Sequence, residues 1–292
     1  MNFKLNSLVA LSLAAGLAIG LMHAPASAQA PDGNQVAKGK GGINRPPDPR
    51  VQQRKYHFAD TNEDLAYAVY VSSKVSKDKK NPLIIALHGL GGDENSLMRG
   101  NALDLAEEGG YILVGPLGYN PRGWYGTPVG TPRAGKGGGA PKGQPNNDPP
   151  NLRELSEKDV MNVLELVRKE FNVDDGRTYL MGHSMGGAGT LYLGTKYASN
   201  WAAIAAIAPA AFAMQPNAAT ILTLVKDTMP VIVTQGDADT AVPVANTRTW
   251  IEVMKDLKMN YKYVEMHGED HGSIISKGMP EIFAFFKAHS KK

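Results

Sequence analysis

The residue of this sequence best placed for chemistry is Ser184, which lies in the stretch Gly-His-Ser-Met-Gly at residues 182–186. A serine hydroxyl becomes an effective nucleophile when it is held beside a base and close to backbone N–H donors. A sharp turn from a strand into a helix holds it in this way but strains its backbone. Gly182 and Gly186 lack side chains, so they would let the strand and the helix approach each other. An apolar run precedes the motif and small residues follow it, and this context predicts that Ser184 is a nucleophile.

Such a serine needs a base, and the loop after the last predicted strand offers His267 and His271. The chain order that accompanies this motif, serine then acid then histidine, favours this loop. We prefer His271 because it lies deeper in the loop, farther from the end of the strand. His88 ends an earlier strand and is expected to brace a loop, whereas His183 adjoins the serine and is expected to point elsewhere. The other histidines fall in the N-terminal leader, before the sheet and on the last helix: His23, His57 and His289.

The acid that orients the base should lie between the serine and the histidine, at the carboxyl end of a strand. Residues 235–239, Gln-Gly-Asp-Ala-Asp, follow a predicted strand and offer two aspartates. We prefer Asp239, with Asp237 second, and the unselected one is interpreted as a residue that caps the loop. Asp227 is less suitable because it precedes its strand.

Two backbone N–H groups are needed to stabilise the oxyanion that forms when such a serine attacks a carbonyl. Met185 directly follows the nucleophile at the start of a predicted helix, where the helix dipole favours negative charge. Leu90, in the stretch His-Gly-Leu-Gly-Gly at residues 88–92, is predicted to supply the second donor. A phosphate-binding loop is the alternative, but no Gly-Lys-Ser/Thr follows and no G-x-G-x-x-G is formed.

The elements that would position these residues alternate between strands and helices over most of the chain. This alternation predicts the α/β class, with a doubly wound, mostly parallel sheet flanked by helices. Ser156 is predicted to cap the helix that follows it. Strands are predicted near residues 56–58, 65–71, 82–87, 111–116, 178–181, 201–207, 230–234 and 261–265. Helices are predicted near residues 97–108, 157–171, 185–197, 218–226, 246–257 and 279–289.

A long segment at residues 118–151 differs in kind from the rest, since it is rich in glycine and proline. Long loops in compact domains are commonly functional or disordered. The aromatic pair Trp124 and Tyr125 favours a wall that flanks the substrate, and a surface excursion without a role is the alternative.

The N-terminus has the pattern of a secretory signal peptide over residues 1–28. Lys4 provides the positive charge, an apolar stretch follows, and Ala-Ser-Ala at residues 26–28 is a cleavage signal. Residues 29–52 read as a flexible N-terminal arm, and residues 53–292 as the catalytic domain. The protein is therefore expected to be exported, to a periplasm or to the medium, with no membrane attachment after cleavage.

Composition excludes several other kinds of function. The formal net charge of the 292-residue chain is +3, and Lys4 is the only charged residue of the leader, which leaves the mature chain near +2. That bias is too weak to predict nucleic acid as a partner. The chain has no cysteine, so disulfides, thiol catalysis and thiolate metal sites are excluded. No cofactor-binding or metal-ligating motif is identified.

Taken together, these motifs make the chain similar to the α/β-hydrolase superfamily. The resemblance covers about residues 54–290 and lies in the esterase branch, with dienelactone-hydrolase-like, polyhydroxybutyrate-depolymerase-like, feruloyl-esterase-like and prolyl-oligopeptidase-like proteins. The family pattern places its aspartate on Asp239. Gln235 stands where the family usually has histidine, and we expect this to leave the triad unaffected. Secreted members often carry disulfides, which this chain cannot form.

The residues and the resemblance together imply a serine carboxylic-ester hydrolase that acts through Ser184, His271 and Asp239. We expect it to act on short-chain or aromatic acyl esters, including esters attached to a polymer or a polysaccharide. A prolyl-oligopeptidase-like serine peptidase is one alternative, and a non-catalytic binding protein on the same fold is another. The acyl and alcohol groups of the substrate and the oligomeric state are left open.

Overall fold

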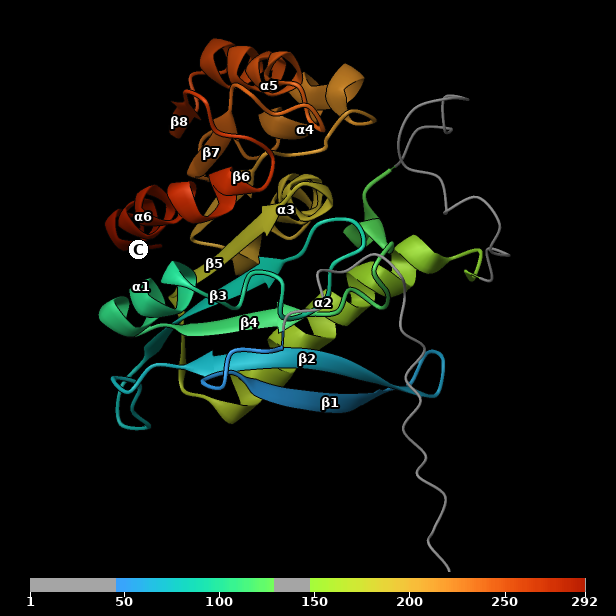
Figure 1. Cartoon of the computed structure of the whole chain (residues 1–292), viewed down its shortest axis with the longest axis vertical. Coiled ribbons are helices and arrows are strands. Elements are labelled where there is room, and N and C mark those ends of the chain that lie inside the picture. The colour runs from blue at the N-terminus through green and yellow to red at the C-terminus, as the bar shows by residue number, and fades with distance from the viewer. Residues whose placement is uncertain (1–45, 129–147, 292) are drawn as a thin grey trace, which may run out of the picture. The chain divides into compact units, whose positions relative to one another are not determined.

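A computed structural model describes residues 46–128 and 148–291 of the chain. Within these ranges the strands form one eight-stranded sheet, in the order β1-β2-β4-β3-β5-β6-β7-β8 (Figure 1). The strands are β1 (Gln52–Phe58), β2 (Glu63–Val71), β3 (Asn81–Leu87), β4 (Ile112–Pro116), β5 (Val173–His183), β6 (Ala203–Ile207), β7 (Val231–Gly236) and β8 (Tyr261–Met266). The helices are α1 (Asn101–Gly109), α2 (Leu152–Glu170), α3 (Met185–Lys196), α4 (Ala218–Thr223), α5 (Val244–Asp256) and α6 (Ser273–Ala288).

The sheet is parallel from β4 to β8 and antiparallel only at its β1 edge. The β1–β2 hairpin pairs Phe58 with Glu63, and β2 runs antiparallel to β4. Strands β3, β6 and β7 are wholly buried and mostly apolar, and so is β5 from residue 178 to its end, as expected for parallel strands covered on both faces. The predicted doubly wound, mostly parallel α/β sheet is confirmed.

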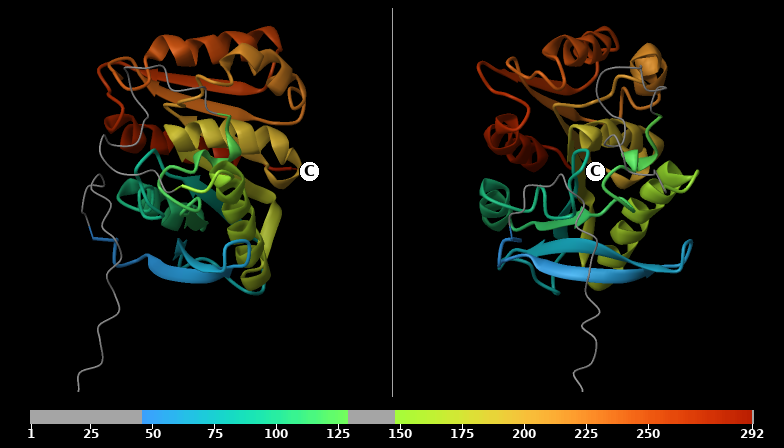
Figure 2. Two further views of the ribbon diagram at one scale, coloured as in Figure 1. Left: turned by 90° about the vertical axis from the view of Figure 1, so that its right-hand side faces the viewer. Right: turned by 45° about the vertical axis from the view of Figure 1, so that its right-hand side comes forward.

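Helices cover both faces of the sheet (Figure 2). Each layer of helices has its own apolar core. Apolar residues of α2, α3, α4 and α5 pack on one face, and the core there includes the buried indoles of Trp201 and Trp250. On the other face α1 and α6 pack side by side, and the ring of Phe286 stacks on Tyr179 at a centroid distance of 4.5 Å. These two layers hold the carboxyl ends of the parallel strands in fixed positions.

Several predicted boundaries differ from those observed. Helix α1 begins at Asn101 rather than near Leu97, because Gly100 has a φ of 58° that a helix cannot continue through. Helix α2 begins at Leu152, so Ser156 is a buried residue inside the helix and not its cap. At the N-terminus strand β1 begins at Gln52, and the side chain of the preceding Val51 is buried.

The predicted leader and most of the predicted arm, residues 1–45, lie outside the described residues, as do residues 129–147 of the long loop. Among the residues that the structure describes, no helix has the length and apolarity that crossing a bilayer requires.

Strand β5 turns into helix α3 through the single residue Ser184. Ser184 adopts a φ of 57° and a ψ of −114°, a strained conformation for a residue with a side chain. A Cβ on Gly182 would lie 2.2 Å from the carbonyl oxygen of Gly186. A Cβ on Gly186 would lie 2.2 Å from the carbonyl oxygen of Leu87, the last residue of β3. Both glycines are therefore required by the close approach of three backbone segments.

We expect Gly186→Ala to lower the free energy of unfolding by about 3 kcal/mol or more, because the new methyl group must displace backbone atoms. Gly268→Ala is the matched control, since Gly268 has a φ of 75° but no heavy atom within 4 Å of the place that the methyl group would take. The control should lose only about 1–2 kcal/mol, the cost of the left-handed backbone alone. Urea unfolding curves of both variants measure the difference, and equal losses would contradict the steric account.

Candidate functional site

Ser184, His271 and Asp239 form one chain of hydrogen bonds at the carboxyl edge of the sheet. Ser184 follows β5, Asp239 follows β7, and His271 follows β8. His271 Nε2 lies 2.9 Å from Ser184 Oγ, and His271 Nδ1 lies 2.7 Å from Asp239 Oδ2. The Asp239 side chain is completely buried, whereas 27% of the His271 side chain is exposed. The structure thus brings together the three residues that sequence analysis preferred, in the geometry of a nucleophile, a base and an orienting acid.

Each oxygen of the Asp239 carboxylate accepts two hydrogen bonds. Oδ1 accepts them from the backbone N–H groups of Ala241 and Val242, each at 2.8 Å. Oδ2 accepts one from the side-chain amide of Gln235 at 3.0 Å, in addition to the bond from His271. A buried carboxylate is tolerated when its oxygens are satisfied in this way, and here the bonds also fix its orientation.

The structure shows that Gln235 contacts the triad directly, and whether its replacement of histidine affects the triad stays a prediction. Its side chain is buried near the end of β7 and donates directly to the oxygen that binds His271. In the sequence, Gln235 precedes Asp239 by only four residues, at the end of a buried strand. Sequence patterns give no direction for such a side chain, so the contact was missed.

The alternative pair, Asp237 and His267, occupies a different place. His267 Nδ1 lies 2.8 Å from Asp237 Oδ2, but the His267 side chain is 99% exposed. Asp237 also accepts a hydrogen bond from the backbone N–H of Gly268 at 2.7 Å. The hydrogen bond between the two side chains raises the pKa of His267 and lowers the pKa of Asp237. The pair ties together the loops after β7 and β8 at the surface, and it does not reach Ser184.

His183, expected to point elsewhere, lies directly against the triad. Its Nε2 donates to the backbone carbonyl of His271 at 2.8 Å, and the centroids of the two rings lie 4.5 Å apart. Only 9% of His183 is exposed. Burial, reinforced by the neighbouring His271, lowers its pKa from the usual value near 6.5 to about 4. His183 is therefore a neutral donor that holds the backbone of the base in place.

The predicted oxyanion donors lie on two turns that meet at the nucleophile. Met185 is the first residue of α3, so its N–H precedes the intrahelical hydrogen bonds. The turn that carries Leu90 is closed by a bond from Gly92 N–H to the Gly89 carbonyl at 3.0 Å. A Cβ on Gly89 would lie 3.3 Å from Ser184 Cβ, which places this turn beside the serine.

His88 braces that turn, as expected from its place at the end of β3. Its ring is buried, with Nδ1 2.8 Å from the Gly89 carbonyl and Nε2 2.7 Å from the Leu117 carbonyl. Burial lowers the pKa of the ring. The ring connects the turn before Leu90 to the segment after β4.

The expectation that Tyr125 flanks the substrate is wrong. Its side chain is fully buried in the core, and its hydroxyl donates to the His88 carbonyl at 3.2 Å. Its ring lies so close to α3 that a Cβ on Gly189 would contact it at 2.7 Å. Trp124, in the same short 3₁₀ helix, is half-buried against this core, and its contact with a substrate stays a prediction.

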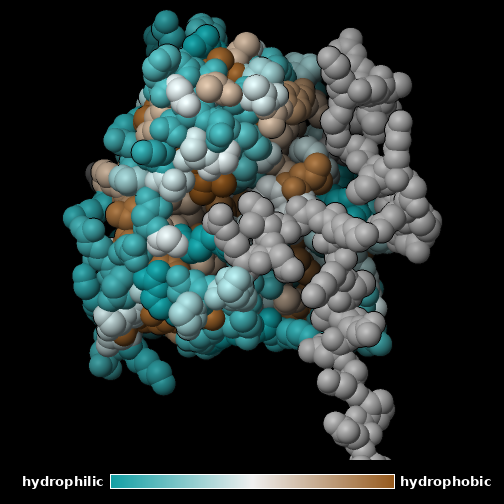
Figure 3. Space-filling model, in the orientation of Figure 1, coloured by the Kyte–Doolittle hydropathy of each residue, from teal (hydrophilic) through white to brown (hydrophobic). Residues whose placement is uncertain are grey.

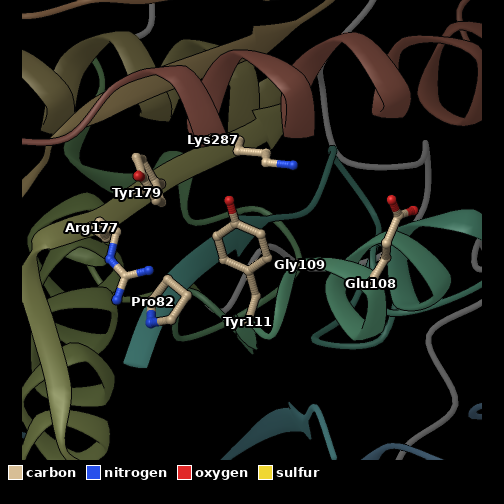
Figure 4. A pocket seen from close by; sticks show the side chains of 7 residues that line it. All are labelled: Pro82, Glu108, Gly109, Tyr111, Arg177, Tyr179 and Lys287. Atoms are coloured by element: carbon tan, nitrogen blue, oxygen red, sulfur yellow. The ribbon is translucent and has the colours of Figure 1, made fainter. Parts of the chain in front are cut away.

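A hollow at the opposite, amino-terminal edge of the sheet contains no nucleophile–base pair (Figure 4). It is lined by Pro82, Glu108, Gly109, Tyr111, Arg177, Tyr179 and Lys287. Within residues 46–128 and 148–291, no group of three or more His, Asp or Glu side chains is arranged to hold a metal ion. The chemistry of the described residues is therefore concentrated around Ser184.

His183 makes folding stability depend on pH. Its folded pKa of about 4 lies below its usual value near 6.5, so the unfolded chain binds the proton more readily. The stabilisation is complete above the higher value and is lost as the pH falls toward the lower one. Replacing the ring by His183→Phe removes this titration. We expect the stability advantage of the native protein over the variant to shrink by about 3 kcal/mol between pH 7 and pH 4. Urea unfolding at several pH values measures this, and parallel curves for the two proteins would contradict it.

Comparison with known proteins supports an esterase relationship. The family model for phospholipases and carboxylesterases matches residues 148–290, which include all three residues of the hydrogen-bonded chain. Feruloyl esterase B of Neurospora crassa is 30% identical over 171 residues, 57% of this chain and 51% of that protein. The chain thus spans about half the length of the curated relative that it matches.

Solved structures share the fold over most of the chain. An S-formylglutathione hydrolase from Agrobacterium tumefaciens has a TM-score of 0.64 and 17% identity, covering 82% of this chain and 94% of that one. A ferulic acid esterase from the anaerobic fungus Anaeromyces mucronatus has a TM-score of 0.60 and 17% identity, with 82% and 91% covered. Together with the sheet order and the serine turn, these likenesses show that the chain has the α/β-hydrolase fold.

Proposed function

We propose that this protein is an exported serine carboxylic-ester hydrolase that works through an acyl-enzyme on Ser184. The observation that carries the proposal is the unbroken hydrogen-bonded chain from Ser184 Oγ through His271 to the buried Asp239 carboxylate. Export rests on the leader-type sequence of residues 1–28, and sequencing of the mature N-terminus decides it.

In the proposed reaction His271 Nε2 takes the proton of Ser184 Oγ as the oxygen attacks the ester carbonyl. Asp239 keeps the Nδ1 proton of His271 in place and stabilises the imidazolium that forms. The same imidazolium gives its proton to the departing alcohol, which leaves an acyl group on Ser184. Water, activated by His271, then attacks the acyl-enzyme and releases the carboxylic acid.

The amides of Leu90 and Met185 are the proposed donors to the tetrahedral oxyanion. The position of Met185 at the start of α3 supports this role, as does the closeness of the Leu90 turn to Ser184. Loss of one such donor typically lowers the rate by on the order of 10²–10³-fold. The turn braced by His88 therefore has an indirect part in the rate, since it holds one of the two amides.

The substrate is proposed to be a short-chain or aromatic acyl ester. Exposed hydrophobic surface is scattered as small patches in a mostly hydrophilic face (Figure 3). Leu90 and Phe212 are among the exposed large hydrophobic side chains of the described residues, at 46% and 43%. Leu90 lies on the turn beside Ser184, and Phe212 lies two residues after Ala210, whose N–H binds the Ser184 carbonyl at 3.0 Å. These two side chains are available to a small apolar group, and a feruloyl esterase among the relatives supports an aromatic one.

A fluorophosphonate probe should form one covalent adduct, on Ser184, because only this serine has a hydrogen-bonded histidine base among the described residues. Peptide mass spectrometry locates the adduct, and Ser184→Ala should abolish it.

His271→Ala should lower ester turnover by on the order of 10³-fold or more, since the base is lost.

His267→Ala is the matched control for that experiment, because it removes a surface histidine from the same loop. It should retain esterase turnover and probe labelling. If the native protein forms no adduct on Ser184, the enzyme proposal is contradicted and a binding protein is favoured. A loss with His267→Ala as large as with His271→Ala would instead show that the base is misassigned.

Esters with acyl chains of two to four carbons should be hydrolysed faster than those with twelve to sixteen. The reason is that, among the described residues, few large apolar side chains are exposed, so a long acyl chain finds little apolar surface there to cover. A series of nitrophenyl esters measures kcat/KM against chain length, with a cinnamoyl ester as the aromatic member and a peptide nitroanilide as the test for amide cleavage. A maximum at the long chains, or preference for the anilide, would overturn the substrate class proposed.

A further inference from the structure

We propose that Gln235 and Thr247 are positioning residues that extend the triad, with Thr247 holding the Gln235 amide and that amide holding the Asp239 carboxylate. The proposal rests on the hydrolase function proposed above and adds two residues through which the rate of that reaction is set. Neither residue reaches the substrate, because both side chains are fully buried.

The Gln235 amide connects three parts of the structure. Its Nε2 donates to Asp239 Oδ2 at 3.0 Å and to the Val242 carbonyl at 3.1 Å. Its Oε1 accepts a hydrogen bond of 2.7 Å from the hydroxyl of Thr247, which lies in the first turn of α5. Strand β7, the loop that carries the acid, and helix α5 are therefore joined by one buried side chain.

The direction of the amide follows from its partners. If the amide were reversed, its oxygen Oε1 would face the Asp239 carboxylate and the Val242 carbonyl. All three groups only accept hydrogen bonds, so none of them would have a donor there. The Thr247 hydroxyl completes the arrangement, because it gives the buried Oε1 its donor. Without that hydroxyl, Oε1 would be left buried and unpaired, which favours a displaced side chain.

The consequence for Asp239 is a fixed carboxylate plane. Two backbone amides hold Oδ1, so the bond from Gln235 is the one that sets where Oδ2 lies apart from His271 itself. If that bond is lost, Oδ2 has only the imidazole as a partner and the carboxylate can tilt. His271 is then less well oriented toward Ser184, which lowers kcat, whereas substrate binding is little affected.

Four variants test this. Gln235→Met keeps the length of the side chain but removes the amide, and we expect kcat per active site to fall about 30-fold with KM within about twofold. Thr247→Val replaces the hydroxyl by a methyl group, and we expect kcat to fall about fivefold. Thr247→Ser restores the hydroxyl and should restore most of kcat. Thr249→Val is the matched control on the same helix, since the exposed Thr249 hydroxyl donates to the Ala245 carbonyl of its own helix.

The double variant separates a relay from two independent structural effects. If Thr247 acts through Gln235, adding Thr247→Val to Gln235→Met should cause no further loss of kcat. Active sites are counted by fluorophosphonate titration, so that misfolded protein does not lower kcat. Thermal unfolding records the loss of stability separately. The proposal would be overturned if the fold-losses of kcat in the two single variants multiplied in the double variant. It would also be overturned if Gln235→Met kept the native kcat.

A second measurement does not depend on turnover. We expect the proton between His271 Nδ1 and Asp239 to give a low-field resonance in proton NMR, and this resonance should move in Gln235→Met and Thr247→Val but not in Thr249→Val. If the native protein neither hydrolyses esters nor labels, the hydrolase function fails while this resonance still tests the relay. If the native protein is active and the resonance is the same in all variants, the relay alone fails.

Discussion

The site depends on one steric constraint, the close approach of three backbone segments at the end of the sheet. Strand β5 must turn into α3 within one residue, and both must pass against the end of β3. The absence of side chains at Gly182 and Gly186 makes this possible, because a Cβ at either position would lie 2.2 Å from a carbonyl oxygen. Ser184 keeps its strained backbone because β5 is held by its pairing with β3 on one side and β6 on the other.

Two Asp–His pairs join the loops after β7 and β8, and burial distinguishes them. The side chains of Asp239 and His271 are 0% and 27% exposed, whereas those of Asp237 and His267 are 29% and 99% exposed. An exposed pair is screened by water and contributes little energy. The buried pair is held by several donors and lies beside Ser184, so its geometry is much better defined. The outer pair joins the same two loops at the surface without defining the geometry of the inner pair.

The sheet and the serine turn could be predicted because their signals are local. Buried parallel strands are apolar runs, and the glycines around Ser184 are needed within two residues of it. The misplaced features depend on the directions of side chains, which no local pattern contains. Tyr125 reads as a surface aromatic in a glycine-rich loop, yet it fills the core against α3. The contact of His183 was missed because the carbonyl that it binds is distant in sequence. The contact of Gln235 was missed because the residues around it in β7 do not show where its amide points.

The proposed mechanism requires that Ser184 attack a carbonyl whose developing charge is taken up by the amides of Leu90 and Met185. A crystal structure of the protein after reaction with a fluorophosphonate tests this requirement most directly, because the phosphonyl oxygen stands in for the oxyanion. We predict a covalent bond to Ser184 Oγ, with that oxygen about 3 Å from both backbone nitrogens. A phosphonyl oxygen that points away from these amides, or an adduct on any other residue, would contradict the mechanism.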